Sequence, residues 1–116
     1  MYNGWIGVDL DGTLVKYDSE AFSPTHVGEP VPLMVERVKG WLADGIEVRI
    51  FTARVASTSF NREEARSAIK KWCLEHIGVE LDVTAEKDYG MIELWDDRCV
   101  QVEENTGRAI QNAKSG

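Results

Sequence analysis

Three short apolar segments, each followed or closed by a polar side chain, constrain the fold of this chain most. Apolar runs of this length are typical of buried strands. The segments and their polar residues are 5–9 with Asp9, 46–51 with Thr52, and 92–95 with Asp96. The carboxyl ends of parallel strands meet at one edge of a sheet, where ligand sites form. We therefore expect these three polar side chains to converge.

Two helical patterns separate the strands. The first begins at Pro32, which suits the first position of a helix, and ends before Gly45. The second is capped by Ser59 or Asn61 and stopped by Gly78. Helical connections between strands favour parallel pairing and right-handed crossovers. The sequence thus predicts an α/β fold, with a three-layer, Rossmann-like parallel sheet and helices on both faces.

The length of the chain fits a single domain over residues 1–116. The sequence predicts a third strand at residues 81–84, and the segment 92–95 is then the fourth. Residues 99–102 are the candidate for a fifth strand. The polar segment 103–116 is expected to be a flexible tail.

The formal net charge of −7 disfavours nonspecific binding to nucleic acid, since the longest basic run is Lys70–Lys71. A substrate phosphate that enters an acidic site would need a cation. Cys73 and Cys99 form no CxxC pair, as expected of reduced thiols in a cytoplasmic protein. No apolar run approaches the roughly 18 residues of a membrane span, and no signal peptide is evident. We expect a cytoplasmic protein with no membrane partner.

Two carboxylates at the end of the first strand carry the strongest chemical signal. Asp9 ends the strand, Asp11 follows two residues later, and Gly12 permits a turn that aims both at one point. Neighbouring carboxylates repel each other unless a cation lies between them, and Mg²⁺ prefers such oxygen ligands. One carboxylate can then attack phosphorus while the other acts as general acid and base. The plain alternative is an ordinary Asp-Gly turn after a strand.

Residues 9–14, Asp-Leu-Asp-Gly-Thr-Leu, resemble motif I of the haloacid dehalogenase (HAD) superfamily. The resemblance implies a Mg²⁺-dependent phosphomonoester hydrolase that works through an aspartyl-phosphate on Asp9. It makes Asp11 the general acid and base, with its backbone carbonyl on the ion, and it places Gly12 and Thr13 at the substrate phosphate. It also implies three further motifs, in order along the chain.

Motifs II and III have candidates downstream. The Thr52 hydroxyl and nearby backbone N–H groups can orient phosphate oxygens, and Ala53 and Arg54 follow as phosphate-binding candidates. A surface salt bridge explains Arg54 about as well. Lys87 is the favoured motif III lysine, which neutralises the phosphate, and Lys70 within the second helix is the alternative.

Motif IV is the acidic pair that follows the strand predicted at residues 92–95. By resemblance, Asp96 binds Mg²⁺, and Asp97 supports the ion directly or through water. The implied metal ligands are therefore Asp9, Asp11 and Asp96. Together the four motifs extend over most of the chain.

Family members commonly carry a cap domain that sets specificity, and this chain has no room for one. The two insertion points hold only residues 14–31 and 78–87. We therefore expect an open site, which suits a large phosphorylated substrate such as a polymer end or a phosphoprotein. Closure by the partner subunit of a homo-oligomer is the alternative. The sequence does not identify the substrate.

Two other functions compete with hydrolysis. A regulatory module of the same fold would bind Mg²⁺ and phosphate without catalysis, although no motif residue is lost here. A receiver domain phosphorylated on Asp9 is disfavoured, because the phospho-acceptor of a receiver typically ends the third strand rather than the first.

Overall fold

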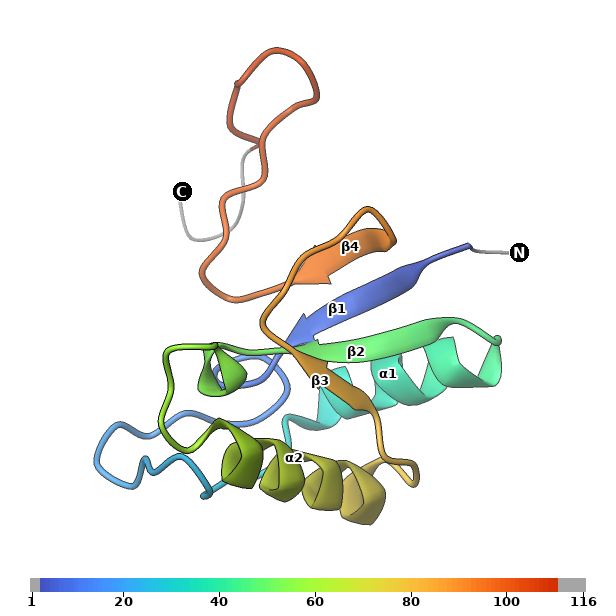
Figure 1. The fold of residues 1–116 in the computed structure, drawn as a ribbon. Helices are drawn as coiled ribbons and strands as arrows, with labels where there is room; N and C mark the ends of the chain where they lie inside the picture. The colour runs from blue at the N-terminus through green and yellow to red at the C-terminus, as the bar shows by residue number, and fades with distance from the viewer. Residues whose placement is uncertain (1–2, 111–116) are drawn as a thin grey trace.

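The computed structural model describes residues 3–110, which form a parallel four-stranded sheet with helices (Figure 1). The strands lie in the order β3-β2-β1-β4. Their bounds are Trp5–Asp9 for β1, Glu47–Phe51 for β2, Asp82–Thr84 for β3 and Met91–Trp95 for β4. The predicted α/β class and the Rossmann-like parallel sheet are confirmed.

The two long helices begin where the sequence predicts. The helical elements are α1 (Pro32–Ala43), the single 3₁₀ turn η1 (Ala53–Val55) and α2 (Arg62–His76). Pro32 opens α1, since proline lacks the N–H that a first helical turn leaves unpaired. Asn61 is the cap residue of α2, and Glu63 and Glu64 lie in the first turn, where the helix dipole favours acidic groups.

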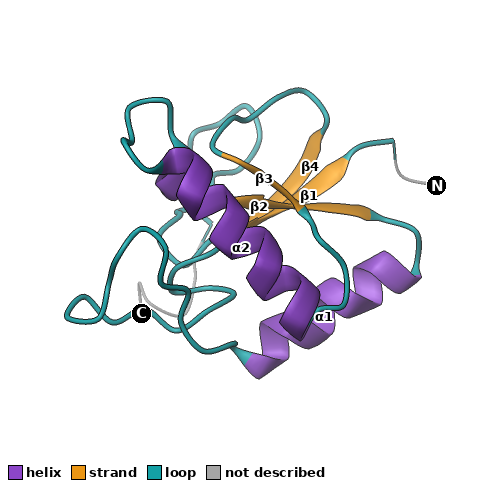
Figure 2. Cartoon of the chain, turned by 60° about the horizontal axis from the view of Figure 1, so that its bottom comes forward, coloured by secondary structure: helices purple, strands orange, loops and turns teal. Residues whose placement is uncertain are grey.

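Both helices pack on one face of the sheet (Figure 2). Val8 pairs with Ile50, which pairs with Val83, so these side chains form a row on that face. The row belongs to a single core that includes Val38 of α1 and Ile69 of α2. This core fixes the sheet against the helices and holds the strand ends in place.

The shared face refines the prediction, which placed helices on both faces. Strands β1, β2 and β3 follow one another in the same direction across the sheet. Right-handed crossovers that run in one direction leave their helices on one side. The return from β3 to β4 runs the opposite way, and residues 85–90 make it without a helix (Figure 1).

Trp5 and the segment 85–90 close part of the opposite face. Trp5 is buried, its indole N–H donates to Oδ1 of Asp88 at 2.9 Å, and the Arg49 guanidinium lies 4.5 Å from the ring centroid. The hydrogen bonds from Trp5 and from the backbone N–H of Gly90 lower the pKa of Asp88. They anchor the end of the crossover beside the first residue of β1.

The prediction of a fifth strand at residues 99–102 is wrong. Val102 forms only an isolated antiparallel bridge with Ala109, and the backbone N–H of Ile110 donates to Gln101 at 2.7 Å. No described helix covers this segment, so its apolar side chains are exposed and gain nothing from joining the sheet. Of the predicted tail, residues 103–110 belong to this small turn and 111–116 lie outside the described residues. Among the described residues, no helix has the length and apolarity to cross a membrane.

Candidate functional site

Three carboxylates meet at the carboxyl ends of β1 and β4. Val8 pairs with Trp95, so Asp9 and Asp96 leave neighbouring strands side by side, and Asp97 follows directly. One oxygen of each of these three aspartates lies within 4.8 Å of the other two. Parallel pairing thus brings together residues from opposite ends of the chain.

Asp9 has an unusual affinity for protons. Its surroundings raise its pKa from 3.8 to about 7. Burial is the largest cause, followed by the negative charge of Asp96, the hydrogen bond and charge of Asp97, and the charge of Asp11. Crowded carboxylates keep a proton unless a cation takes its place. The cluster therefore has the electrostatic character of a site for a divalent cation.

The turn after β1 positions Asp97 on this cluster. Gly12 has a φ of +91°, and a Cβ there would lie 2.6 Å from Oδ2 of Asp97. The Thr13 hydroxyl accepts the backbone N–H of Asp97 at 3.0 Å and lies 3.5 Å from Oδ2 of Asp9. The backbone N–H of Gly12 donates to Val15. Gly12 and Thr13 thus hold the carboxylates in position, and their contact with phosphate stays a prediction.

Asp11 turns its carboxylate away from the cluster and pairs with Arg54. Nε and Nη2 of Arg54 donate to the two carboxylate oxygens at 2.9 and 2.7 Å. The pair is bidentate, and only 9% of Arg54 is exposed. Asp11 is therefore absent from the side-chain cluster, and the ligand implied for it by resemblance is its backbone carbonyl.

Arg54 also holds the loop of residues 16–31. Its Nη1 donates to three backbone carbonyl oxygens, at 3.0 Å in Ser23, 3.2 Å in Pro24 and 2.7 Å in His26. Trp72 of α2 donates its indole N–H to the carbonyl of Gly28 at 3.0 Å. The loop is thus a fixed wall beside the strand ends. Arg54 was predicted to contact phosphate or to form a surface salt bridge. In the structure its guanidinium is bonded to Asp11 and to the carbonyls of this loop.

Thr52 directly follows β2 and is 3% exposed. Its backbone N–H donates to the carbonyl of Thr84 at 2.9 Å. Its Oγ1 accepts the backbone N–H of Arg54 at 3.2 Å and so caps η1. Because the hydroxyl acts as an acceptor in that bond, its own proton can be donated to a ligand.

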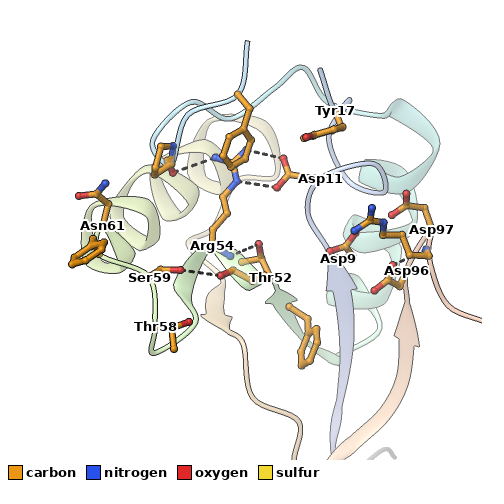
Figure 3. A pocket seen from close by; sticks show the side chains of 16 residues that line it. Asp9, Asp11, Tyr17, Thr52, Arg54, Thr58, Ser59, Asn61, Asp96 and Asp97 are labelled. Atoms are coloured by element: carbon orange, nitrogen blue, oxygen red, sulfur yellow. Dashed lines mark hydrogen bonds and ion pairs between the residues drawn. The ribbon is translucent and has the colours of Figure 1, made fainter. Parts of the chain in front are cut away.

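The acidic cluster and Thr52 line one pocket of about 870 Å³ (Figure 3). The residues of the predicted site that line it are Asp9, Asp11, Thr52, Ala53, Arg54, Asp96 and Asp97. We expected an open site because the chain has no cap domain. Residues of the loop 16–31 line the pocket on one side, and residues 58–61 line it on another.

Neither Lys87 nor Lys70 lines this pocket. Lys87 precedes Asp88, whose bond to Trp5 holds it near the first residue of β1, whereas the pocket lies at the carboxyl ends. Lys70 lies in the middle of α2. The cationic side chains that line the described pocket are Arg54 and Arg98.

Sequence reasoning missed Arg98 and three aromatic side chains that line the pocket from outside the strands, Tyr17, Phe22 and Phe60. Arg98 directly follows the acidic pair, and its backbone N–H donates to Oδ1 of Asp96 at 2.8 Å. Its position directly after motif IV could have identified Arg98 as a residue of the site. The aromatic residues lie in polar connections outside the periodic segments, which was a second signal.

No family model and no curated protein matches this chain. The fold is similar to the solved structure of a conserved protein from Bacteroides thetaiotaomicron, with a TM-score of 0.54 and 23% identity. The match covers 84% of this chain and 78% of that one. This likeness supports the fold and carries no information on activity.

Proposed function

We propose that this protein is a Mg²⁺-dependent phosphomonoester hydrolase of the HAD type that forms an aspartyl-phosphate on Asp9. The observation that carries the proposal is the convergence of Asp9, Asp96, Asp97 and Thr52 in one pocket at the strand ends. Phosphoryl transfer to a carboxylate needs a fixed nucleophile, a cation and donors to the phosphate oxygens. This pocket combines groups suited to each task.

The acidic cluster fits Mg²⁺ through the chemistry of its donors. Its three carboxylates offer oxygen atoms to a hard cation. Without one, burial and then the charges of the neighbouring carboxylates raise the pKa of Asp9 to about 7. Asp9 and Asp96 would hold the ion together with the backbone carbonyl of Asp11, and Asp97 would support it. When bound, the ion cancels charge that otherwise repels the incoming phosphate.

The chain's own residues then take defined roles. Asp9, fixed at the end of β1, attacks phosphorus in line with the leaving oxygen. Thr52 donates its hydroxyl proton to a phosphate oxygen, and Arg98 takes the neutralising role first assigned to Lys87. Asp11 has the acid and base role that the resemblance implies. Its carboxylate is paired with Arg54, so it must leave the guanidinium and take up a proton before it protonates the leaving oxygen, and the carboxylate left by that transfer then activates water.

Hydrolysis of 4-nitrophenyl phosphate, with and without Mg²⁺, tests this proposal. We expect turnover that requires the ion and falls by more than about 10³-fold in Asp9→Asn. Asp82→Asn is the matched control, because Asp82 is an exposed aspartate at the start of β3 that does not line the pocket.

Wild-type activity in Asp9→Asn would refute the nucleophile. No turnover across a broad panel of phosphate esters, with Mg²⁺ binding intact, would instead favour the non-catalytic Mg²⁺- and phosphate-binding module.

We also infer a cytoplasmic location from the thiols. Cys73 is buried and Cys99 is exposed, and both are free. Free thiols are usual in a reducing compartment. Localisation of the tagged protein in its native cell tests this inference.

A further inference from the structure

The part of the pocket remote from the acidic cluster has a different chemistry. Two aromatic side chains line it, Phe22 from the loop 16–31 and Phe60 from the turn before α2. A third, Tyr17, lines the pocket nearer to Asp9 and lies 6.1 Å from Phe22, centroid to centroid (Figure 3). Thr58, Ser59 and Asn61 line it as well, and Figure 3 shows them on the side away from Asp96 and Asp97. The proposed hydrolytic steps use none of these side chains.

The aromatic rings stand in solvent although they line a cavity. Phe60 is fully exposed, and Tyr17 is 57% exposed. Phe22 is held between two neighbours, since its ring centroid lies 6.1 Å from that of Tyr17 and 4.5 Å from the guanidinium carbon of Arg54. Exposed apolar rings beside a pocket leave a favourable interaction unmade, and a planar ligand would supply it by stacking.

Polar groups accompany these rings. The Ser59 hydroxyl donates to the carbonyl of Ala53 at 3.4 Å, which leaves its lone pairs for a ligand. Asn61 occupies the cap position of α2 without a side-chain hydrogen bond to the helix. An amide side chain carries both donors and acceptors, and this combination matches the edges of nucleobases.

We propose that the substrate is a nucleoside monophosphate, with its phosphate at the acidic cluster and its base stacked among Tyr17, Phe22 and Phe60. This inference rests on the proposed hydrolase function and names its substrate class. The pocket volume of about 870 Å³ falls within the range of roughly 300–1,000 Å³ that is typical of small-molecule sites. The net charge of −7 opposes a polyanionic nucleic acid, whereas a single phosphate is balanced by Mg²⁺ and Arg98.

The test compares esters that differ only in the base. Hydrolysis of the four ribonucleoside 5′-monophosphates is measured against ribose 5-phosphate, which has the same sugar and phosphate. Stacking of a base on an aromatic side chain predicts an advantage in kcat/KM of about 5- to 100-fold for at least one nucleotide. Phe60→Ala should reduce this ratio severalfold. Tyr89→Ala, which removes an equally exposed ring outside the pocket, should leave it unchanged.

The outcomes separate this inference from the hydrolase proposal. Equal rates for nucleotides and ribose 5-phosphate, or a higher rate on a phosphotyrosine peptide, overturn the inference while hydrolysis stands. If no ester is hydrolysed, the hydrolase proposal fails. The subsite is then judged by calorimetric binding of AMP and ribose 5-phosphate to the protein in Mg²⁺. Equal affinities overturn it, and tighter binding of AMP that weakens in Phe60→Ala supports it.

Discussion

At the scale of single residues, the carboxyl group of Asp9 links stability to pH. Its pKa of about 7 lies above the ordinary value of 3.8. Between these two values the folded protein keeps a proton that the unfolded chain has released, so stability falls as pH rises through this window. Asn cannot ionise and removes this dependence.

We therefore expect Asp9→Asn to stabilise the metal-free protein at pH 8 and to have little effect at pH 4. Solvent reaches part of Asp9, so the expected gain in unfolding free energy at pH 8 is about 1–2 kcal/mol. Urea denaturation of both proteins in chelator at several pH values measures it. A difference that stays constant with pH contradicts the assigned cause.

Gly12 sets the position of the neighbouring carboxylate. A Cβ would be strained at a φ of +91° and would push against Asp97, so we expect Gly12→Ala to lose about 1–3 kcal/mol of unfolding free energy. We also expect it to bind Mg²⁺ more weakly. Gly40 in α1 has no atom within 4 Å of an added Cβ, and Gly40→Ala should gain about 0.5–1 kcal/mol. Equal effects of the two substitutions in thermal denaturation would contradict this account.

At the scale of elements, Arg54 joins η1 to the loop 16–31 through the forked geometry of its guanidinium. Lysine keeps the charge but cannot reproduce the bidentate pair with Asp11 and the bonds to three carbonyls. We expect Arg54→Lys to lose about 2–4 kcal/mol of unfolding free energy, as for other broken buried pairs. Backbone amides in the loop should exchange hydrogen faster.

Arg62→Lys is the control for that substitution. The Arg62 side chain is exposed, with a single ion pair to Glu63 at 3.9 Å. Its replacement should change the unfolding free energy by less than about 0.5 kcal/mol. Unchanged exchange in the loop of Arg54→Lys would show that other contacts hold the wall.

Local signals decided which elements were predictable. Pro32 and Gly45 bracket α1 because proline and glycine act on the backbone next to them. Residues 99–102 have an apolar composition similar to that of β4, but composition does not reveal whether a helix is available to cover a strand. For the same reason, the sequence did not predict that residues 85–90 cross between strands without a helix. The position of Lys87, remote from the pocket, could therefore not be predicted either.

At the scale of the whole molecule, the site depends on strand order. The convergence of Asp9, Thr52 and Asp96 followed from the general rule for parallel strand ends, so sequence alone was sufficient. To predict the pairing of Asp11 with Arg54, the path of η1 would have to be known, and no periodic pattern in the sequence indicates it. The aromatic part of the pocket required the path of a loop, which depends on tertiary contacts.

Mg²⁺ should stabilise the whole fold, because a ligand that binds the folded state alone shifts the unfolding equilibrium. At a concentration 100 times Kd, the expected gain in unfolding free energy is about 2.7 kcal/mol. Thermal denaturation at constant ionic strength measures it. Asp96→Asn should lose most of this gain and Asp82→Asn should keep it. An equal gain in both variants would place the ion elsewhere.

The grip of Arg54 on backbone carbonyls has an evolutionary consequence. Every amino acid provides a carbonyl oxygen, so the identities of Ser23, Pro24 and His26 are not fixed by that attachment. Substitutions can accumulate along this stretch while Asp9 stays where it is. Under the proposed hydrolase function, we expect substrate preference in descendants of this gene to drift faster than the chemistry performed.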